Sequence, residues 1–179
     1  HSNIEGVLDG RAIFTLREAW DYQGKTYPQG SIVAYDLQRG TAEPVFAANG
    51  TQSVETVAVG RTGLVVQYLE DVSGKAVRVL RTPQGEWRAT PIALSANGAL
   101  KIASAGRGTD DGMRSCESLT PPLTLYYVSA NDAIEQIFTT PAAYDATDVV
   151  VEQRFATSTD GTRIPYFVMG RKSVLARGN

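Results

Sequence analysis

The chain has 179 residues, 42% of them hydrophobic, and a formal net charge of −2. This length is enough for one domain with a real core, and the near balance of charges argues against nucleic acid or an anionic membrane as a partner. No apolar run approaches the roughly 20 residues that a membrane helix needs. Cys116 and His1 are the only residues of their kinds, which excludes an intrachain disulfide and a zinc cage of Cys and His ligands. We therefore expect no cofactor, no metal, and a soluble protein of the cytoplasm or periplasm.

The predicted elements are strands from one end of the chain to the other. His1 to Asn3 could be the remnant of a tag and are given no element. Turn signals rich in Gly, Asn and Asp separate the apolar runs, and no segment keeps a helical period beyond a couple of turns. The expected strands cover residues 11–18, 30–37, 42–47, 53–60, 63–71, 75–82, 86–92, 99–105, 112–120, 123–130 and 133–140.

A weak internal repeat organises these strands. The segments RAIFTLRE, GLVVQYLE and GMRSCESL begin at residues 11, 63 and 112, and each is followed by two further apolar runs. A period of roughly 40–50 residues with about four strands is typical of a β-propeller blade, with a large β-sandwich as the alternative. The fold class is therefore predicted as all-β: a partial β-propeller of about three four-stranded antiparallel blades plus a C-terminal hairpin. Three blades do not close a ring.

Catalytic residues are not expected in this chain. A serine triad needs a histidine as general base, and a G-x-S-x-G segment is absent. The adjacent acids Asp110–Asp111 and Glu70–Asp71 are the next candidates, either for acid–base work or for a Ca²⁺ site. Neighbouring acids in loops are more often solvated turn formers, and we favour that interpretation.

Two further features allow both a functional and a structural interpretation. Cys116 is predicted to be a small buried side chain, with a reactive thiol as the alternative. Residues 104–114 form a long, Gly-rich, charged segment, in which Arg107 and Arg114 could meet a carboxylate or a partner protein. We favour a mobile connector for this segment.

Aromatic residues also gather between the first two predicted strands. Trp20, Tyr22 and Tyr27 lie within residues 17–30. They could line a substrate passage or a contact surface, or pack against a neighbouring blade, and the sequence does not choose between these roles.

The last third of the chain predicts a hairpin. Asp160–Gly161 suits a two-residue turn, because Gly adopts positive φ without steric cost. Pro165 lacks an N–H group, so it belongs on an edge strand or at a transition between elements. The hairpin therefore ends the run of blade-like repeats with a strand that could pair further only outside them.

This segment closely resembles a known junction. Residues 149–172 are similar to the place in the prolyl oligopeptidase family of serine peptidases where the propeller gives way to the α/β-hydrolase domain. The family pattern Ser-x-Asp-Gly-Thr-x-Ile-Pro is matched by Ser158, Asp160, Gly161, Thr162, Ile164 and Pro165. Residues 118–127 resemble the family's segment T-x-P-x-T-L-Y in the last blade, and residues 17–37 resemble a propeller hairpin of bacterial members.

The resemblance implies two parts and a function. Residues 1–148 would be propeller blades, and residues 149–179 a truncated hairpin that begins the catalytic domain. Family members resemble serine endopeptidases that cut short peptides after proline, with a propeller that covers the active site and excludes folded proteins. The chain would then be a gating and size-filtering fragment without catalytic residues, and its partners would be the missing catalytic domain, the remaining blades and short peptides. A free-standing propeller-like interaction domain is the alternative.

The ends of an incomplete propeller should expose apolar faces. Residues 11–18 and 30–37 are expected to supply one such face, and residues 123–128 the other. Large exposed apolar patches are rare on monomers, so we expect the isolated chain to self-associate, most simply as a symmetric dimer.

Overall fold

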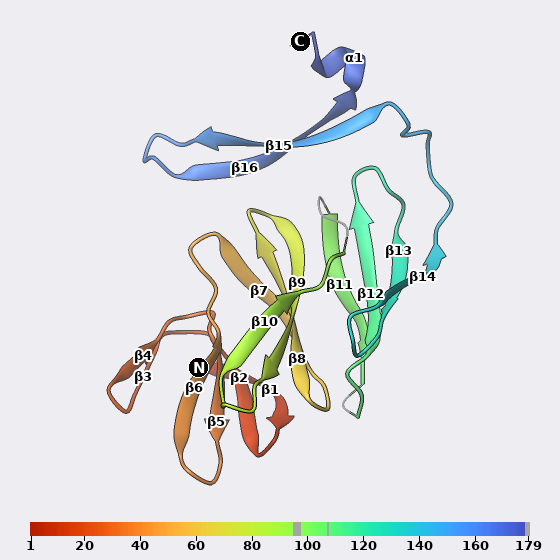
Figure 1. Cartoon of the computed structure of the whole chain (residues 1–179). Helices are drawn as coiled ribbons and strands as arrows, with labels where there is room; N and C mark the ends of the chain where they lie inside the picture. Colours follow the sequence, from red (N-terminus) through yellow and green to blue (C-terminus); the bar gives the residue numbers. More distant parts are fainter. Residues whose placement is uncertain (95–97, 107, 178–179) are drawn as a thin grey trace.

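The computed structural model describes residues 1–94, 98–106 and 108–177, and within them the chain is almost entirely β (Figure 1). These residues form three antiparallel four-stranded sheets and two separate two-stranded hairpins. The first sheet contains β1 (Ser2–Leu8), β2 (Arg11–Leu16), β5 (Ile32–Asp36) and β6 (Thr41–Phe46). The second contains β7 (Gln52–Val59), β8 (Gly63–Glu70), β9 (Ser73–Arg81) and β10 (Trp87–Pro91). The third contains β11 (Gly98–Ala105), β12 (Gly112–Ser118), β13 (Thr124–Val128) and β14 (Ile134–Thr139).

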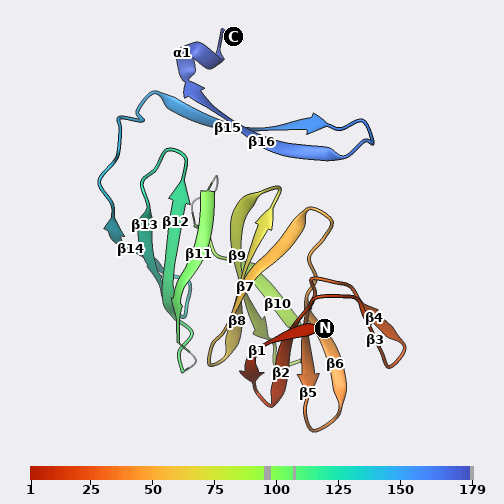
Figure 2. The same cartoon turned by 180° about the vertical axis from the view of Figure 1, so that it is seen from behind.

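The three sheets stand side by side as blades (Figure 2). In each sheet the strands follow one another in chain order, and β7 contacts both β1 and β11, so that the first strand of every sheet lies at the same inner edge. The repeated segments that begin at residues 11, 63 and 112 are the second strands β2, β8 and β12. The prediction of a partial β-propeller with three four-stranded blades is therefore confirmed.

The sequence did not predict β1. This strand pairs with β2, but its register shifts between Ile4 and Gly6, where a bulge interrupts the alternation of side chains. Ile4 and Val7 are 70% and 60% exposed, so the strand also lacks the clear apolar face that marks a buried strand. The segment with the possible tag remnant is thus the inner strand of the first sheet.

The first core lies between sheets one and two. Ile13, Ile32 and Ala34 of the first sheet are fully buried, and they meet Val66 and Val79 of the second. Burying an aliphatic side chain of this kind contributes about 1.5–3 kcal/mol. These contacts join the first two sheets into one packed unit.

The second core lies on the opposite face of sheet two. Val65 and Ala76 pack against Leu100, Cys116 and Val128 of the third sheet. Successive residues of a strand point to opposite faces, so β8 sends Val65 to one core and its neighbour to the other. The central sheet is covered on both sides, which explains why its strands are apolar on both faces.

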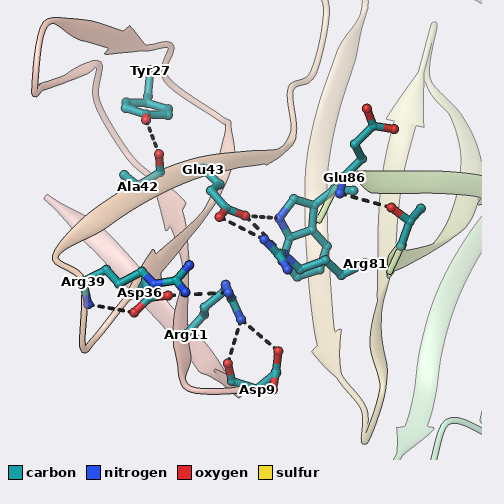
Figure 3. Close-up of polar contacts among 11 residues, drawn as sticks. Asp9, Arg11, Tyr27, Asp36, Arg39, Ala42, Glu43, Arg81 and Glu86 are labelled. Carbon is teal, nitrogen blue, oxygen red and sulfur yellow. Dashed lines mark hydrogen bonds and ion pairs between the residues drawn. The ribbon is translucent and has the colours of Figure 1, made fainter. Parts of the chain in front are cut away.

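A short hairpin covers part of the outer face of the first sheet. It consists of β3 (Trp20–Tyr22) and β4 (Lys25–Tyr27), inserted between β2 and β5. Tyr27 is 4% exposed and packs with Leu16 and Val33, and its hydroxyl donates to the Ala42 carbonyl at 2.7 Å (Figure 3). The rings of Trp20 and Tyr22 stack at 4.6 Å between centroids.

This hairpin corrects one sequence prediction and shows where three aromatic residues pack. Residues 11–18 and 30–37 do not supply an open face over their length, because the hairpin's aromatic rings shelter Val33 and Leu16. Trp20, Tyr22 and Tyr27, whose role the sequence left open, pack on their own sheet. The segment predicted to supply the open face of the third sheet, residues 123–128, is itself buried or half-buried. The exposed apolar residue lies on the neighbouring strand: Phe138, which pairs with Leu125, is 54% exposed.

A second hairpin crosses the ends of the sheets (Figure 1). It consists of β15 (Val149–Thr157) and β16 (Arg163–Arg171), followed by the single turn α1 (Lys172–Leu175). Its turn has three residues rather than the predicted two, since Ser158 N–H donates to the Thr162 carbonyl and Gly161 alone has positive φ, at 85°. Pro165 lies opposite Phe155 in a two-stranded sheet, where every strand is an edge, as its missing N–H predicts.

The turn between β8 and β9 generates a stability prediction. Its two residues, Asp71 and Val72, have φ of 46° and 61°, which is unfavourable for a β-branched side chain. Replacing Val72 by Gly relieves roughly 1–2 kcal/mol of strain and costs about 0.5–1 kcal/mol of unfolded-state entropy. We expect Val72→Gly to raise the free energy of unfolding by about 0.5–1 kcal/mol, measured by urea denaturation.

Val174→Gly is the matched control for this substitution. Both valines are 48% exposed, but Val174 lies in α1 and has no positive φ. The control should give no gain in stability. A loss of stability in Val72→Gly would contradict the strained turn.

Candidate functional site

Polar side chains of the described residues gather mainly where neighbouring sheets meet. Within residues 1–94, 98–106 and 108–177, no group of three or more His, Cys, Asp or Glu side chains is placed to hold a metal ion. His1 lies at the start of the chain, where its amino group pairs with Glu18. The structure instead offers two polar seams between the sheets and one polar cleft.

The seam between sheets two and three is organised by Arg78 of β9. Its side chain is 4% exposed, and all three of its nitrogens donate into the third sheet. Nε bonds Asp132 at 2.6 Å, Nη1 bonds the Asp110 carbonyl at 2.7 Å, and Nη2 bonds the Ser129 carbonyl at 2.8 Å. One buried guanidinium therefore fixes two loops of the third sheet at once.

Asp110 completes this seam from the opposite side. Its carboxylate accepts from the Thr62 N–H and from the Thr62 hydroxyl, both at 2.8 Å. Burial raises the pKa of Asp110, but these hydrogen bonds and the nearby charge of Arg61 outweigh burial, so the pKa is lowered overall. The neighbouring Asp111 accepts from the Tyr127 hydroxyl at 2.6 Å, and this bond raises the pKa of Tyr127.

The prediction that these adjacent acids are solvated turn formers is therefore wrong. The Asp110 side chain is only 7% exposed, and it joins two sheets. The other pair matches its prediction better: Asp71 forms the β8–β9 turn, while Glu70 accepts from the Gln52 side chain at 2.6 Å.

Arg114 is a structural residue rather than a contact for a partner. It is 1% exposed, and Nη1 donates to the carbonyls of Ser104 and Met113 at 3.0 and 2.9 Å. Burial lowers the pKa of Arg114. Ala105 pairs with Gly112, so the strands extend into the predicted long connector and leave only a short loop. Arg107 lies outside the described residues.

The seam between sheets one and two is a clamp around Glu43. Its carboxylate accepts from Arg81 at 3.1 and 3.3 Å and from the Trp87 indole N–H at 3.1 Å (Figure 3). All three side chains are partly exposed, so this seam is weaker than the one around Arg78.

Cys116 is buried in the second core, which confirms its prediction as a small buried side chain. Burial raises the pKa of its thiol, which lowers the fraction of reactive thiolate at neutral pH.

A polar cleft of about 530 Å³ opens between sheets one and two, where β1 and β7 begin. Asn3 and Glu5 line it from β1, Gln52 and Glu55 from β7, and Arg17 from the end of β2. The cleft lies on the side of the sheets that the β15–β16 hairpin crosses. Asp71 N–H donates to the Thr51 carbonyl beside the cleft, and the Gln153 side chain of β15 donates to the Asp71 carbonyl.

The residues that match the junction motif lie at the turn of the β15–β16 hairpin and at the start of β16. Asp160 accepts from the Thr162 N–H at 2.9 Å, and this bond lowers the pKa of Asp160. The Arg163 guanidinium lies 3.5 Å from the centre of the Phe155 ring. These contacts shape the turn, and they bring none of the junction residues into the cleft lining.

The sequence did not identify the residues that organise these seams and the cleft. Arg78 carried one signal, a charge in the middle of the apolar run KAVRVLR. Glu5, Glu55 and Gln153 carried none, since isolated polar residues are ordinary on strands.

Known peptidases are similar to this chain in sequence and in fold. The chain is 32% identical to an uncharacterized peptidase of Sinorhizobium fredii over 98% of its own length and 25% of that protein. It superposes on a post-proline cleaving enzyme from Rickettsia typhi with a TM-score of 0.79 at 20% identity, covering 96% of the chain and 26% of the enzyme. Prolyl oligopeptidase B from Galerina marginata gives 0.74 at 18% identity, covering 96% and 23%. No protein-family model matches the chain.

The three sheets define an open part of a β-propeller. By sequence the chain matches part of a peptidase, and by fold it matches the propeller portion of solved prolyl oligopeptidases, which confirms the resemblance of its junction motif. The chain spans about a quarter of the curated relatives and solved structures that it matches. Among its described residues, no helix is long and apolar enough to cross a membrane.

The Arg78 seam predicts a large loss of stability on substitution. Arg78→Met keeps the apolar stem but removes three hydrogen bonds and leaves Asp132 without its partner. We expect a loss of about 3 kcal/mol in the free energy of unfolding, the range for breaking a buried ion pair. Arg88→Met is the control, because Arg88 is exposed on the same sheet and should change stability by less than about 0.5 kcal/mol. Equal effects would contradict the seam.

The lowered pKa of Asp110 predicts that the free energy of unfolding depends on pH. Its folded pKa lies below the unfolded value of about 3.9, so its stabilisation is present above that pH and is lost as pH falls through the folded pKa. Asp110→Asn should cost about 1–2 kcal/mol at neutral pH, and the difference from the unaltered chain should shrink in acid. Urea denaturation at neutral and acidic pH measures this. Thr62→Val removes one of the two bonds and should cost about half as much; a difference that grows in acid would contradict the assignment.

Proposed function

We propose that this chain is the gating part of a prolyl oligopeptidase-like serine peptidase that acts on short peptides. Residues 1–148 would be propeller blades that cover the active site and exclude folded proteins, and they would contribute no catalytic residue. Residues 149–179 would begin the α/β-hydrolase domain. The missing catalytic domain and the remaining blades would be the partners of this chain within the complete enzyme.

The observation that carries the proposal is the match to a peptidase along almost the entire chain. Identity of 32% over 98% of the chain, confined to 25% of the relative, is what a part of a larger peptidase gives. The solved structures with the same fold include a post-proline cleaving enzyme and oligopeptidases.

The position of the β15–β16 hairpin supports a separation between propeller blades that filter substrates and a domain that carries out catalysis. The β15–β16 strands form their own sheet, which touches the second blade through Gln153 and the Asp71 carbonyl. A second contact joins the Tyr144 hydroxyl, just before the hairpin, to the Leu119 carbonyl at 2.7 Å. A hinge between a filter and a catalytic domain needs such few and polar contacts, because they break at low cost.

The test compares substrates of different size on the complete protein. The same proline-containing sequence is presented as a short fluorogenic peptide and as a loop of a folded domain. We expect cleavage of the peptide and protection of the folded domain, and no turnover by the 179-residue chain alone. Gln153→Ala loosens the hinge contact and should increase cleavage of longer peptides relative to short ones.

Gln136→Ala is the control, because Gln136 is exposed on β14 and makes no hydrogen bond to the described side chains. It should leave the ratio of long to short substrates unchanged. A complete protein without peptidase activity, with an intact mass equal to the 19.3 kDa of this chain, would favour the free-standing interaction domain.

A further inference from the structure

We propose that β14, at the outer edge of the third sheet, is a contact surface for a second copy of this chain, and that the two β14 strands pair antiparallel about a two-fold axis. β14 pairs with β13 on one side, and among the described residues no strand lies along its other side (Figure 1). The inference does not rest on the proposed function. Blades that complete a propeller pack on the faces of neighbouring sheets, whereas β14 lies at the border opposite the inner strand β11.

Two residues of β14 turn their backbone N–H and C=O groups away from β13. In an antiparallel pair, residues that exchange hydrogen bonds alternate with residues whose backbone groups point to the other side. The Ser129 N–H donates to the Ala133 carbonyl at 2.9 Å, which makes these two residues a hydrogen-bonded pair. Along the register from there, Ile134 and Gln136 take non-hydrogen-bonded positions, so their backbone groups face outward.

This run of outward-facing groups is short and has fixed ends. Before it, Asp132 lies in the turn with a φ of 64°, and its carboxylate is bonded to Arg78. After it, a bulge shifts the register of β14. The Thr140 N–H donates to the Leu123 carbonyl beyond the bulge, so the alternation directs the backbone groups of Phe138 toward β13. A partner strand therefore meets two open positions between the turn and the bulge.

A second β14 strand matches these two positions. With the two-fold axis at Glu135, Ile134 of each copy lies opposite Gln136 of the other, and their outward backbone groups bond one another. An axis at Gln136 would place Ile134 opposite Phe138, whose backbone groups face β13. An axis at Ile134 would place Gln136 opposite Asp132 in the turn. The backbone of β14 therefore selects one symmetric register.

The outer edges of the other two sheets are protected against such pairing. β6 contains Pro44 and β10 contains Pro91, and a proline on an edge strand cannot donate a hydrogen bond to an added strand. β14 contains no proline, and its Ile134, Ile137 and Phe138 side chains are exposed. Pairing with a second copy would remove part of this apolar surface from water.

Charge keeps this contact weak. In the selected register the Glu135 side chains of the two copies lie directly opposite each other, at a position where Cα atoms approach to about 4.5 Å. Like charges placed in this way destabilise a strand pair. A contact through one short strand also falls below the roughly 1,200 Å² of a stable interface. We therefore expect a transient dimer whose affinity depends on the charge of residue 135.

The experiment exchanges this charge. The ¹⁵N-labelled unaltered chain is titrated at low salt with unlabelled unaltered chain or with unlabelled Glu135→Lys, and the shifts of the Ile134 and Gln136 backbone signals give the dissociation constants. Replacing two facing carboxylates by a Glu–Lys pair should tighten association about fivefold, and high salt should reduce the gain. Glu135→Lys titrated with itself should gain nothing, because two lysines then face each other.

Glu117→Lys is the matched control, because Glu117 is exposed on β12, which has a strand on both sides. It should bind the unaltered chain as the unaltered chain binds itself. Gln136→Pro removes an outward N–H that β13 does not use, and it should weaken association.

Three results would overturn the proposal. They are no association at millimolar concentration, equal dissociation constants for Glu135→Lys and Glu117→Lys, and undiminished association of Gln136→Pro. Association through another face of the chain would give the second result. If Gln136→Pro failed to fold, the exchange of charge would still decide. Each of these results is independent of whether the complete protein is a peptidase.

Discussion

The packing of the central sheet on both of its faces is the constraint on which the rest of the structure depends. Along β8, Val65 faces the third sheet and Val66 faces the first, and both are buried. A sheet with two apolar faces cannot stand in water alone, because each uncovered face would forfeit about 25 cal/mol for every Å² of apolar surface left exposed. The second sheet is therefore stable only between its two neighbours, and this is why the chain folds as a row of blades.

Apolar packing alone would not set the angle between these blades, since hydrophobic contact has no preferred direction. Polar contacts provide that direction. Arg78 and Asp110 fix the third sheet against the second, and the Glu43 carboxylate holds Arg81 across the other seam. A further bond, from the Ile102 N–H to the buried Gln67 side chain at 2.9 Å, ties β11 to β8 where the pairing of β11 shifts register.

The sequence predicted what depends on local pattern and missed what depends on distant contacts. Apolar runs of strand length bounded by turn signals predicted the strands of sheets two and three, because both features are local properties of each segment. Arg78 could not be assigned a role, since its partner Asp132 lies 54 residues away and only the packed sheets bring the two together. The residues of the cleft were missed for the same reason, because β1 and β7 meet only after two sheets have formed.

The sequence also did not predict where some strands end and their connections begin. The segment of residues 104–114 contains Gly and Asp residues typical of a loop, yet cross-strand pairing continues through Ala105 and Gly112. The hairpin inserted between β2 and β5 was interpreted as a connection, since its strands have only three residues each. Short strands gain their stability from the sheet they cover, and this contact is invisible in their own pattern.

The C-terminal hairpin shows the opposite situation: its sequence pattern predicts it clearly, but it makes few contacts with the rest of the chain. A two-stranded sheet is marginal in water without further cover. Ile164, Tyr166 and Met169 of β16 are 42–51% exposed. The hairpin bonds the second blade through Gln153, and the Met169 sulfur accepts from the Tyr144 hydroxyl of the segment that precedes the hairpin. Under the proposed function, an adjoining catalytic domain would cover those apolar side chains. The blades then hold the hairpin in place by only a few hydrogen bonds, and the cleft opens on the side that it crosses. The hairpin can tilt relative to the blades without disturbing their cores, because none of the three core clusters includes a residue of the hairpin.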